Sequence, residues 1–153
     1  MSISRLTITP QDIEQHYAVI SKIGNLGPSP EDGYLRAAWS NEETAAMKYI
    51  EQAALQAGLT SRWDALLNLC VETPGDYTEW VECGSHLDTV PQGGNFDGAA
   101  GVVSGLESLI KIFSSDSSRK RGLRLRVWRC EESATFNSVY AGSLGAFGQA
   151  RPD

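Results

Sequence analysis

The stretch CGSHLDTVPQGGNFDGAAGV, residues 83–102, decides the fold, because it carries the end of a strand, a glycine-rich turn and the start of a helix. The run TEWVECGSHL (78–87) is typical of a strand. After the turn, FDGAAGVVSGLESLIKIF (96–113) has the small and apolar spacing of a buried helix, with Asp97 at or near its N-terminus. A strand, a turn and a helix in this order are the basic unit of an α/β layer fold.

Two further helices are expected before this stretch. The first begins where Thr9 can act as the cap and Pro10 occupies the first helical position. The second begins with Ser40 or Asn41 as its cap and stops at Gly58. Each helix has apolar residues at helical spacing, so each is expected to cover a sheet with one face.

The remaining strands complete the predicted sheet. The runs ALLNLCVE (65–72) and 78–87 are separated by a turn with Pro74 and Gly75, which favours a β-hairpin between them. A last strand, LRLRVWRCEE (123–132), ends in two glutamates. The predicted fold class is therefore α/β, a mixed sheet flanked by helices.

Composition limits the classes of function. A chain of 153 residues with 41% hydrophobic residues is long enough for one domain, predicted over 1–153. The formal net charge of -6 gives no basic surface for nucleic acid or anionic membranes, and no apolar run approaches the roughly 18 residues of a membrane span. Three cysteines without CxxC spacing and an N-terminus without an apolar signal segment lead us to expect a cytoplasmic protein.

Polar side chains with metal-ligand chemistry follow the predicted strands. His86 and Asp88 are two residues apart and are expected on one face at the C-terminal end of their strand, where α/β sheets usually place their chemistry. Asp88 suits a supporting role, since carboxylates often orient metal-binding histidines. Asp97 follows a turn that contains Gly93 and Gly94, and its two carboxylate oxygens could bridge two cations.

Glu131 and Glu132 stand at the end of the next strand. Near a metal ion, one of them could coordinate it while the other accepts a proton from a water that the ion has acidified. Taken singly, each feature has a simpler interpretation: a hydrogen-bonded His-x-Asp pair, a helix cap at Asp97, or a solvated acidic face. The combination at the ends of successive elements favours a metal site.

The sequence GSHLDTVPQGGNFDGAAGVVSGLE, with EE some thirty residues later, resembles the M20-type metallohydrolases. Within them it is most similar to the amidase/carbamoylase branch: N-carbamoyl-L-amino-acid hydrolases, allantoate amidohydrolases and β-ureidopropionases. Weaker similarity in RAAWSNEETAA, EESATF and AGSLGAFG extends the resemblance over the chain from about Arg36 onward.

The resemblance implies a role for each candidate residue. His86 binds one metal ion, Asp97 bridges two ions, and Glu132 binds the second. Glu131 is the general base, and Asp88 is the carboxylate that supports the ligands. The implied reaction is hydrolysis of a non-peptide C–N bond in a small N-carbamoyl or ureido substrate, with two zinc or manganese ions per site.

The family's fold is an aminopeptidase-like catalytic domain with an inserted lid, and its members hold the bridging aspartate beside a cis peptide, here Asp97–Gly98. Family members are considerably longer, and their two other metal-binding histidines follow the region matched here. We therefore expect the N-terminal half of the catalytic domain, without the lid or its dimer interface. Each metal would keep two protein ligands, so we expect at most one weakly held ion and impaired activity.

Two alternatives to this function stay open. One is a catalytically dead, truncated remnant of such an enzyme. The other is a relative within the M20 aminopeptidases or deacetylases, which share the His-x-Asp and Glu-Glu pattern. The second histidine, His16, falls in the first predicted helix, where a hydrogen-bonded or exposed side chain is expected rather than a ligand.

Overall fold

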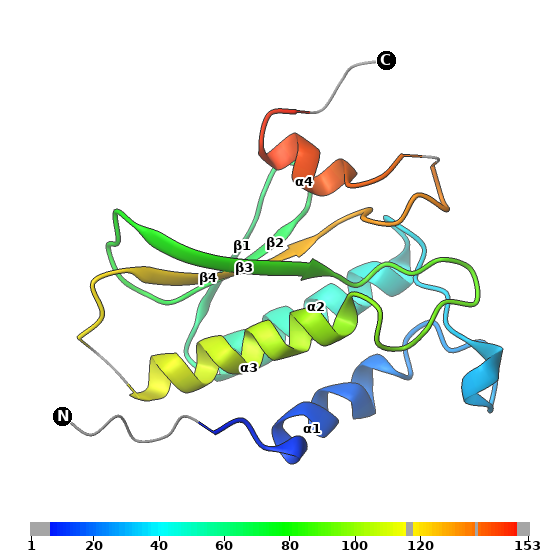
Figure 1. Ribbon diagram of the computed structural model, residues 1–153, viewed down its shortest axis with the longest axis horizontal. Coiled ribbons are helices and arrows are strands. Elements are labelled where there is room, and N and C mark those ends of the chain that lie inside the picture. Colours follow the sequence, from blue (N-terminus) through cyan, green and yellow to red (C-terminus); the bar gives the residue numbers. More distant parts are fainter. Residues whose placement is uncertain (1–6, 116–117, 137, 150–153) are drawn as a thin grey trace.

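A computed structural model of the chain describes residues 7–115, 118–136 and 138–149. A four-stranded sheet lies between helices, with the chain running from blue to red in Figure 1. The elements are α1 (Pro10–Ile20), the short 3-10 helix η1 (Pro30–Asp32), α2 (Asn41–Gln56), β1 (Thr60–Trp63), β2 (Leu69–Glu72), β3 (Trp80–His86), α3 (Ala99–Ser115), β4 (Gly122–Trp128) and α4 (Ala141–Ala146).

The sheet is mixed, with strand order β1-β2-β4-β3. The pairs β1–β2 and β2–β4 are antiparallel, whereas β3 and β4 are parallel and are joined through α3. The predicted fold class, a mixed sheet flanked by helices, is confirmed. Because β3 and β4 run in the same direction, their C-terminal ends meet at one edge of the sheet.

The predicted hairpin between residues 65–72 and 78–87 is wrong. Strand β4 lies between these two segments, pairing with β2 on one side and with β3 on the other. The turn signal at Pro74 and Gly75 marks a change of chain direction, but it does not decide which strand becomes the neighbour. The hairpin forms instead between β1 and β2, around a turn in which Leu67 has a φ of 62°.

The predicted helix starts are confirmed. At α1, the Thr9 side chain accepts a hydrogen bond from the backbone N–H of Asp12, and Pro10 is the first helical residue. At α2, Ser40 rather than Asn41 is the cap. These side chains satisfy backbone donors that have no partner within the helix.

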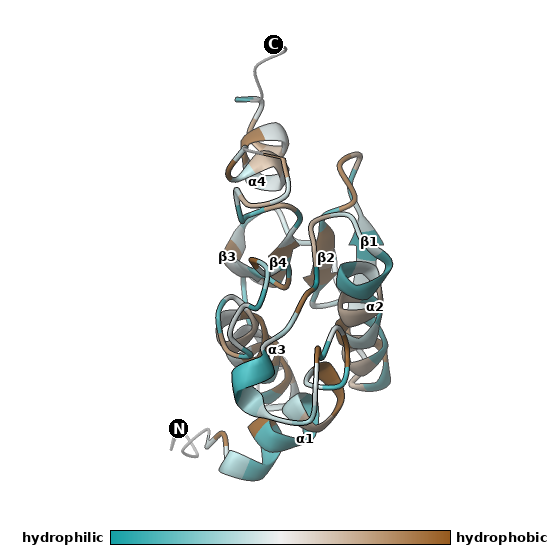
Figure 2. Cartoon of the chain, turned by 90° about the vertical axis from the view of Figure 1, so that its right-hand side faces the viewer, coloured by the Kyte–Doolittle hydropathy of each residue, from teal (hydrophilic) through white to brown (hydrophobic). Residues whose placement is uncertain are grey.

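Helices α2 and α3 pack against the same face of the sheet, and α1 packs against α3 on the outside (Figures 1 and 2). The fit is close at Gly105 of α3, where a Cβ atom would lie 2.8 Å from Cδ1 of Leu125. Burial of apolar surface between the two layers is the main stabilising contribution to such a fold. The fully buried core includes Met47, Ile50, Leu69, Val71, Val102, Leu106, Leu125 and Val127.

The other face of the sheet carries charged side chains. Arg124 forms ion pairs with Glu72 and Glu82 of the neighbouring strands, and Arg126 pairs with Glu82. Arg124 also lies over the Trp80 ring, 4.4 Å from its centroid. This alternation of apolar and charged residues along β4 explains why the strand was recognisable from the sequence.

Candidate metal centre

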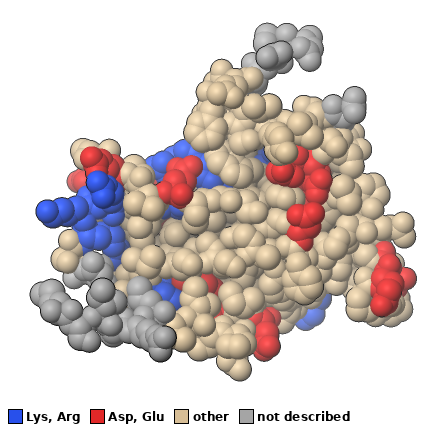
Figure 3. Space-filling view, viewed as in Figure 1, with Lys and Arg blue, Asp and Glu red and all other residues tan. Residues whose placement is uncertain are grey.

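The ends of β3 and β4 bring the predicted site residues together. His86 is the last residue of β3 and pairs with Trp128 of β4, so the turn after β4 lies beside it. A ring nitrogen of His86 and one carboxylate oxygen from each of Glu131 and Glu132 lie within 4.8 Å of one another. In Figure 3, acidic side chains gather just beyond the ends of these two strands.

Asp88 links the two strand ends through its carboxylate. Its Oδ1 accepts a hydrogen bond of 3.2 Å from the backbone N–H of Glu131, and its Oδ2 accepts one of 3.0 Å from that of Glu132. Asp88 is fully buried, and its Oδ1 also lies 3.3 Å from Nδ1 of His86. The carboxylate therefore fixes the backbone from which both glutamates project.

Asp88 also orients the imidazole of His86. Nδ1 of His86 lies 3.1 Å from the main-chain oxygen of Asp88. Since a carbonyl oxygen only accepts, this contact requires the proton on Nδ1 and leaves the lone pair of Nε2 for another partner. Nε2 faces Oε2 of Glu131 at 3.5 Å and Oδ1 of Asp97 at 3.7 Å. This is the usual arrangement of a histidine prepared to bind a metal ion.

Asp97 is placed differently from the other acidic residues. Its side chain is 70% exposed, and it lies outside the three-residue group among the described residues. The predicted cis peptide at Asp97–Gly98 is wrong: every peptide bond in the described segments is trans. Gly98 makes the turn with a φ of 65°, a conformation that glycine adopts without steric cost.

The charges at the site shift the pKa values of two side chains. Burial acts to lower the pKa of His86, but the carboxylates of Asp88 and Glu131 outweigh it and leave this pKa above its ordinary value. Burial, together with repulsion from Glu131, Asp97 and Asp88, raises the pKa of Glu132, although His86 acts in the opposite direction. The excess of acidic groups favours a positive charge at this position.

The donor set suits a divalent cation. One imidazole nitrogen and carboxylate oxygens are the ligands by which proteins hold zinc, and carboxylates also suit manganese. His86 is buried and oriented, while Glu131 and Glu132 are half-buried at the rim. The residues present therefore fit such an ion.

Two buried basic groups around this site were not identified from the sequence. Arg129 precedes the two glutamates and forms a 2.6 Å ion pair with Glu43 of α2, although both side chains are almost fully buried. Arg36 is fully buried beside the end of β3. The sequence does not show that these charged side chains are buried, because burial depends on tertiary contacts.

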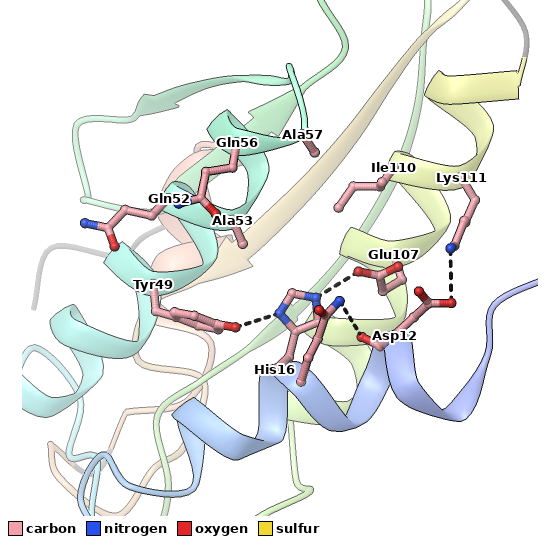
Figure 4. A pocket seen from close by; sticks show the side chains of 11 residues that line it. Asp12, His16, Tyr49, Gln52, Ala53, Gln56, Ala57, Glu107, Ile110 and Lys111 are labelled. Carbon is pink, nitrogen blue, oxygen red and sulfur yellow. Dashed lines mark hydrogen bonds and ion pairs between the residues drawn. The ribbon is translucent and has the colours of Figure 1, made fainter.

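The second histidine belongs to another part of the molecule. His16 is buried between α1, α2 and α3, with Nε2 2.8 Å from Oε1 of Glu107 and Nδ1 3.0 Å from the hydroxyl of Tyr49 (Figure 4). It borders a groove of about 380 Å³, which is also lined by the ion pair of Asp12 and Lys111. The expectation that His16 is a hydrogen-bonded side chain is confirmed.

The mixed sheet flanked by helices, with a histidine and carboxylates beyond the ends of two parallel strands, is the fold of the carbamoylase and M28 peptidase domains. A family model described as peptidase family M28 matches residues 68–150, more than half of the chain, and the chain belongs to this family. The matching family is M28, whereas the sequence motif resembles the M20 type. The amidase/carbamoylase resemblance itself is confirmed by the individual relatives.

Several relatives are named as hydrolases of carbamoyl or ureido compounds. The N-carbamoyl-L-amino-acid amidohydrolase of Pseudomonas sp. (strain NS671) is 30% identical over 150 residues, covering 97% of this chain and 36% of the relative. The allantoate amidohydrolase of Escherichia coli (strain K12) is 30% identical over 133 residues, covering 86% of this chain and 32% of the relative. The chain thus spans about a third of the length of these relatives.

The solved structures agree with this assignment. A hydantoinase/carbamoylase family amidase from Burkholderia ambifaria has a TM-score of 0.84 and 31% identity, covering 95% of this chain and 35% of that chain. A zinc-dependent exopeptidase structure from Bacteroides vulgatus, with 15% identity and a TM-score of 0.63, shares the fold. No helix in the described part of the chain has the length and apolar character to cross a membrane.

Proposed function

We propose that this chain provides part of the catalytic centre of a metal-dependent amidohydrolase, which cleaves a non-peptide C–N bond in N-carbamoyl or ureido compounds. The observation that carries the proposal is the group of His86, Glu131 and Glu132 at the meeting point of β3 and β4. Asp88 holds all three through its contacts to one imidazole and two backbone N–H groups.

The proposal gives each residue a distinct task. Nε2 of His86 and the carboxylate of Glu132 would hold the ion, and the exposed Asp97 carboxylate, 3.7 Å from Nε2, is near enough to join them. A bound zinc or manganese ion would polarise a substrate carbonyl and lower the pKa of water to roughly 7. Glu131 would accept the proton from the attacking water on its Oε2, which faces the imidazole.

The number of donors favours one ion rather than two. Catalytic zinc normally has three protein ligands and one open position. His86, Asp97 and Glu132 together provide one such set, whereas two separate ions would leave each with two protein ligands. We therefore propose a single ion for this chain, with modest affinity.

The substrate class comes from the relatives. Their names describe hydrolysis of N-carbamoyl amino acids, allantoate and ureidoglycolate, which share a ureido group. A small molecule with this group is the proposed substrate and partner, and the net charge of -6 supports no nucleic-acid partner. The peptidase description of the matching family favours peptide hydrolysis as the second candidate.

A substrate comparison tests the proposal. The purified protein, loaded with Mn²⁺ or Zn²⁺, is assayed on N-carbamoyl amino acids, allantoate and a dipeptide, with Glu131→Gln as the matched inactive variant. The proposal expects slow, Glu131-dependent hydrolysis of a ureido compound. Cleavage of the dipeptide alone would support the peptidase candidate. Absence of turnover on all three would support the catalytically dead remnant.

A further inference from the structure

Arg36 has an unusual environment for a charged side chain. It is fully buried, and its Nε donates a 2.8 Å hydrogen bond to the main-chain oxygen of Leu87, while Nη1 donates to that of Ile23 at 3.3 Å. Nη2 is buried and has no hydrogen-bond partner among the described residues. Burying a guanidinium that binds carbonyls rather than a carboxylate costs free energy of folding. This cost points to a role for Arg36 beyond stability.

The backbone of Arg36 contacts the same segment. Its N–H donates a 2.9 Å hydrogen bond to the hydroxyl of Thr89, and its carbonyl accepts a 3.0 Å bond from the N–H of Thr89. Leu87 and Thr89 are the two residues that flank Asp88. One arginine therefore fixes the chain on both sides of the carboxylate that connects β3 to the two glutamates.

The charge of Arg36 also acts on this segment. Burial lowers the pKa of the guanidinium, whereas the side chains of Tyr34, Tyr17 and Asp88 act to raise it. The guanidinium thus attracts the carboxylate that accepts the backbone hydrogen bonds of Glu131 and Glu132. Position and charge therefore work together on Asp88.

We propose that Arg36 is a positioning residue for the metal centre. By fixing Leu87 through its guanidinium, beside the backbone bonds of the same residue to Thr89, it aims the Asp88 carboxylate at the backbone of Glu131 and keeps the proton of His86 on Nδ1. Nε2 then remains free for a cation. The functional meaning of this inference rests on the proposed metal centre, but the effect on His86 exists in the metal-free protein.

The imidazole tautomers provide a direct test, because the sequence contains two histidines. Nitrogen NMR of the metal-free protein, at a pH where both imidazoles are neutral, reports the tautomer of each. Arg36→Met removes the charge and the side-chain hydrogen bonds to Leu87 and Ile23 at similar length, while the backbone bonds to Thr89 remain. Arg36→Lys keeps the charge. Arg124→Met is the control, because Arg124 is also a packed arginine but forms its ion pairs near the other end of β4.

We expect the wild type and Arg124→Met to hold His86 with the proton on Nδ1. Arg36→Met should give a mixture of tautomers at His86 and leave the signals of His16 unchanged. Arg36→Lys should give an intermediate proportion of the Nδ1 tautomer at His86. If Arg36→Met does not fold, Arg36→Lys provides the test. In a parallel Mn²⁺ titration, loss of Arg36 should weaken binding by about tenfold, the lower limit for residues that support metal ligands.

Two results would overturn the inference. One is an unchanged His86 tautomer in every folded Arg36 variant. The other is a simultaneous change at His16 and His86, which would indicate a general structural role. If the wild type binds no Mn²⁺ at all, the proposed metal centre fails, while the tautomer result still decides the role of Arg36.

Discussion

The carboxylate of Asp88 accepts a 3.0 Å hydrogen bond from the backbone N–H of Glu132, which is 44 residues further along the chain. This contact joins the end of β3 to the turn after β4. Because the same aspartate also contacts His86, the proposed ligands depend on one buried acid. Its replacement should therefore affect metal binding more than it affects the fold.

We predict that Asp88→Asn weakens Mn²⁺ binding by about 10- to 100-fold. The amide NH₂ group cannot accept, so one of the two backbone N–H groups of Glu131 and Glu132 loses its partner. Isothermal titration calorimetry measures the affinity. Asp76→Asn, at an exposed position in the turn before β3, should bind like the wild type. Equal affinity for all three proteins would refute the role of Asp88.

Gly98 is predicted to be essential for the position of His86. A Cβ atom on Gly98 would lie 2.6 Å from Cε1 of His86 and would also require a φ of 65° that other residues rarely adopt. Gly98→Ala should therefore lower the free energy of unfolding by more than about 1 kcal/mol and displace the imidazole. Gly94→Ala is the control, since its Cβ meets nothing within 4 Å. Urea denaturation and the NMR signals of His86 measure both effects, and equal behaviour of the two variants would contradict the prediction.

The buried ion pair of Glu43 and Arg129 should contribute strongly to the free energy of unfolding. Glu43→Gln leaves the Arg129 guanidinium buried with its charge uncompensated, so we expect a loss of about 3–5 kcal/mol in the free energy of unfolding. Glu42→Gln, at the neighbouring exposed position, should change it by less than about 0.5 kcal/mol. A similar small change in both variants, measured by chemical denaturation, would show that the pair contributes little.

Asp12 should make the stability depend on acidic pH. Hydrogen bonds from the backbone and hydroxyl of Thr9, followed by the contact with Lys111, lower the pKa of Asp12 from 3.8 to about 2. Because the folded pKa is below the unfolded one, the stabilisation is complete above the unfolded value and is lost as pH falls toward about 2.

The comparison of Asp12→Asn with the wild type isolates this contribution. The difference in unfolding free energy between the two proteins should shrink as pH is lowered from about 5 to about 2. Glu14→Gln, on the exposed side of α1, serves as the control for removal of a surface carboxylate from the same helix. A constant difference between Asp12→Asn and the wild type over this pH range would contradict the assigned pKa.

Local signals predicted most elements of the fold. The caps Thr9 and Ser40 gave the starts of α1 and α2, and the alternation in 123–132 gave β4. The sequence did not predict β1 or the partner of β2, because strand pairing is decided by contacts between distant segments. A turn at Pro74 was therefore misinterpreted as a hairpin.

The candidate site was predictable because its residues stand at the ends of two predicted strands. His86 is the last residue of β3 and Glu132 follows β4, and parallel pairing of those strands brings their ends together. The support from Arg36 and Arg129 was not predictable, since a charged side chain shows nothing of its burial in a single sequence. The sequence thus identified Asp88 as a supporting group, whereas the two buried arginines came from the structure alone.

The most direct test of the account is a calorimetric titration of the metal-free protein with Mn²⁺ and with Zn²⁺. The account predicts one saturable ion per chain, with affinity reduced at least about tenfold in His86→Asn and Glu132→Gln. It predicts no change in Glu79→Gln, an exposed acid at the start of β3. Binding of two ions would contradict the ligand count. No saturable binding by the wild type, or equal binding by all the variants, would contradict the metal centre itself.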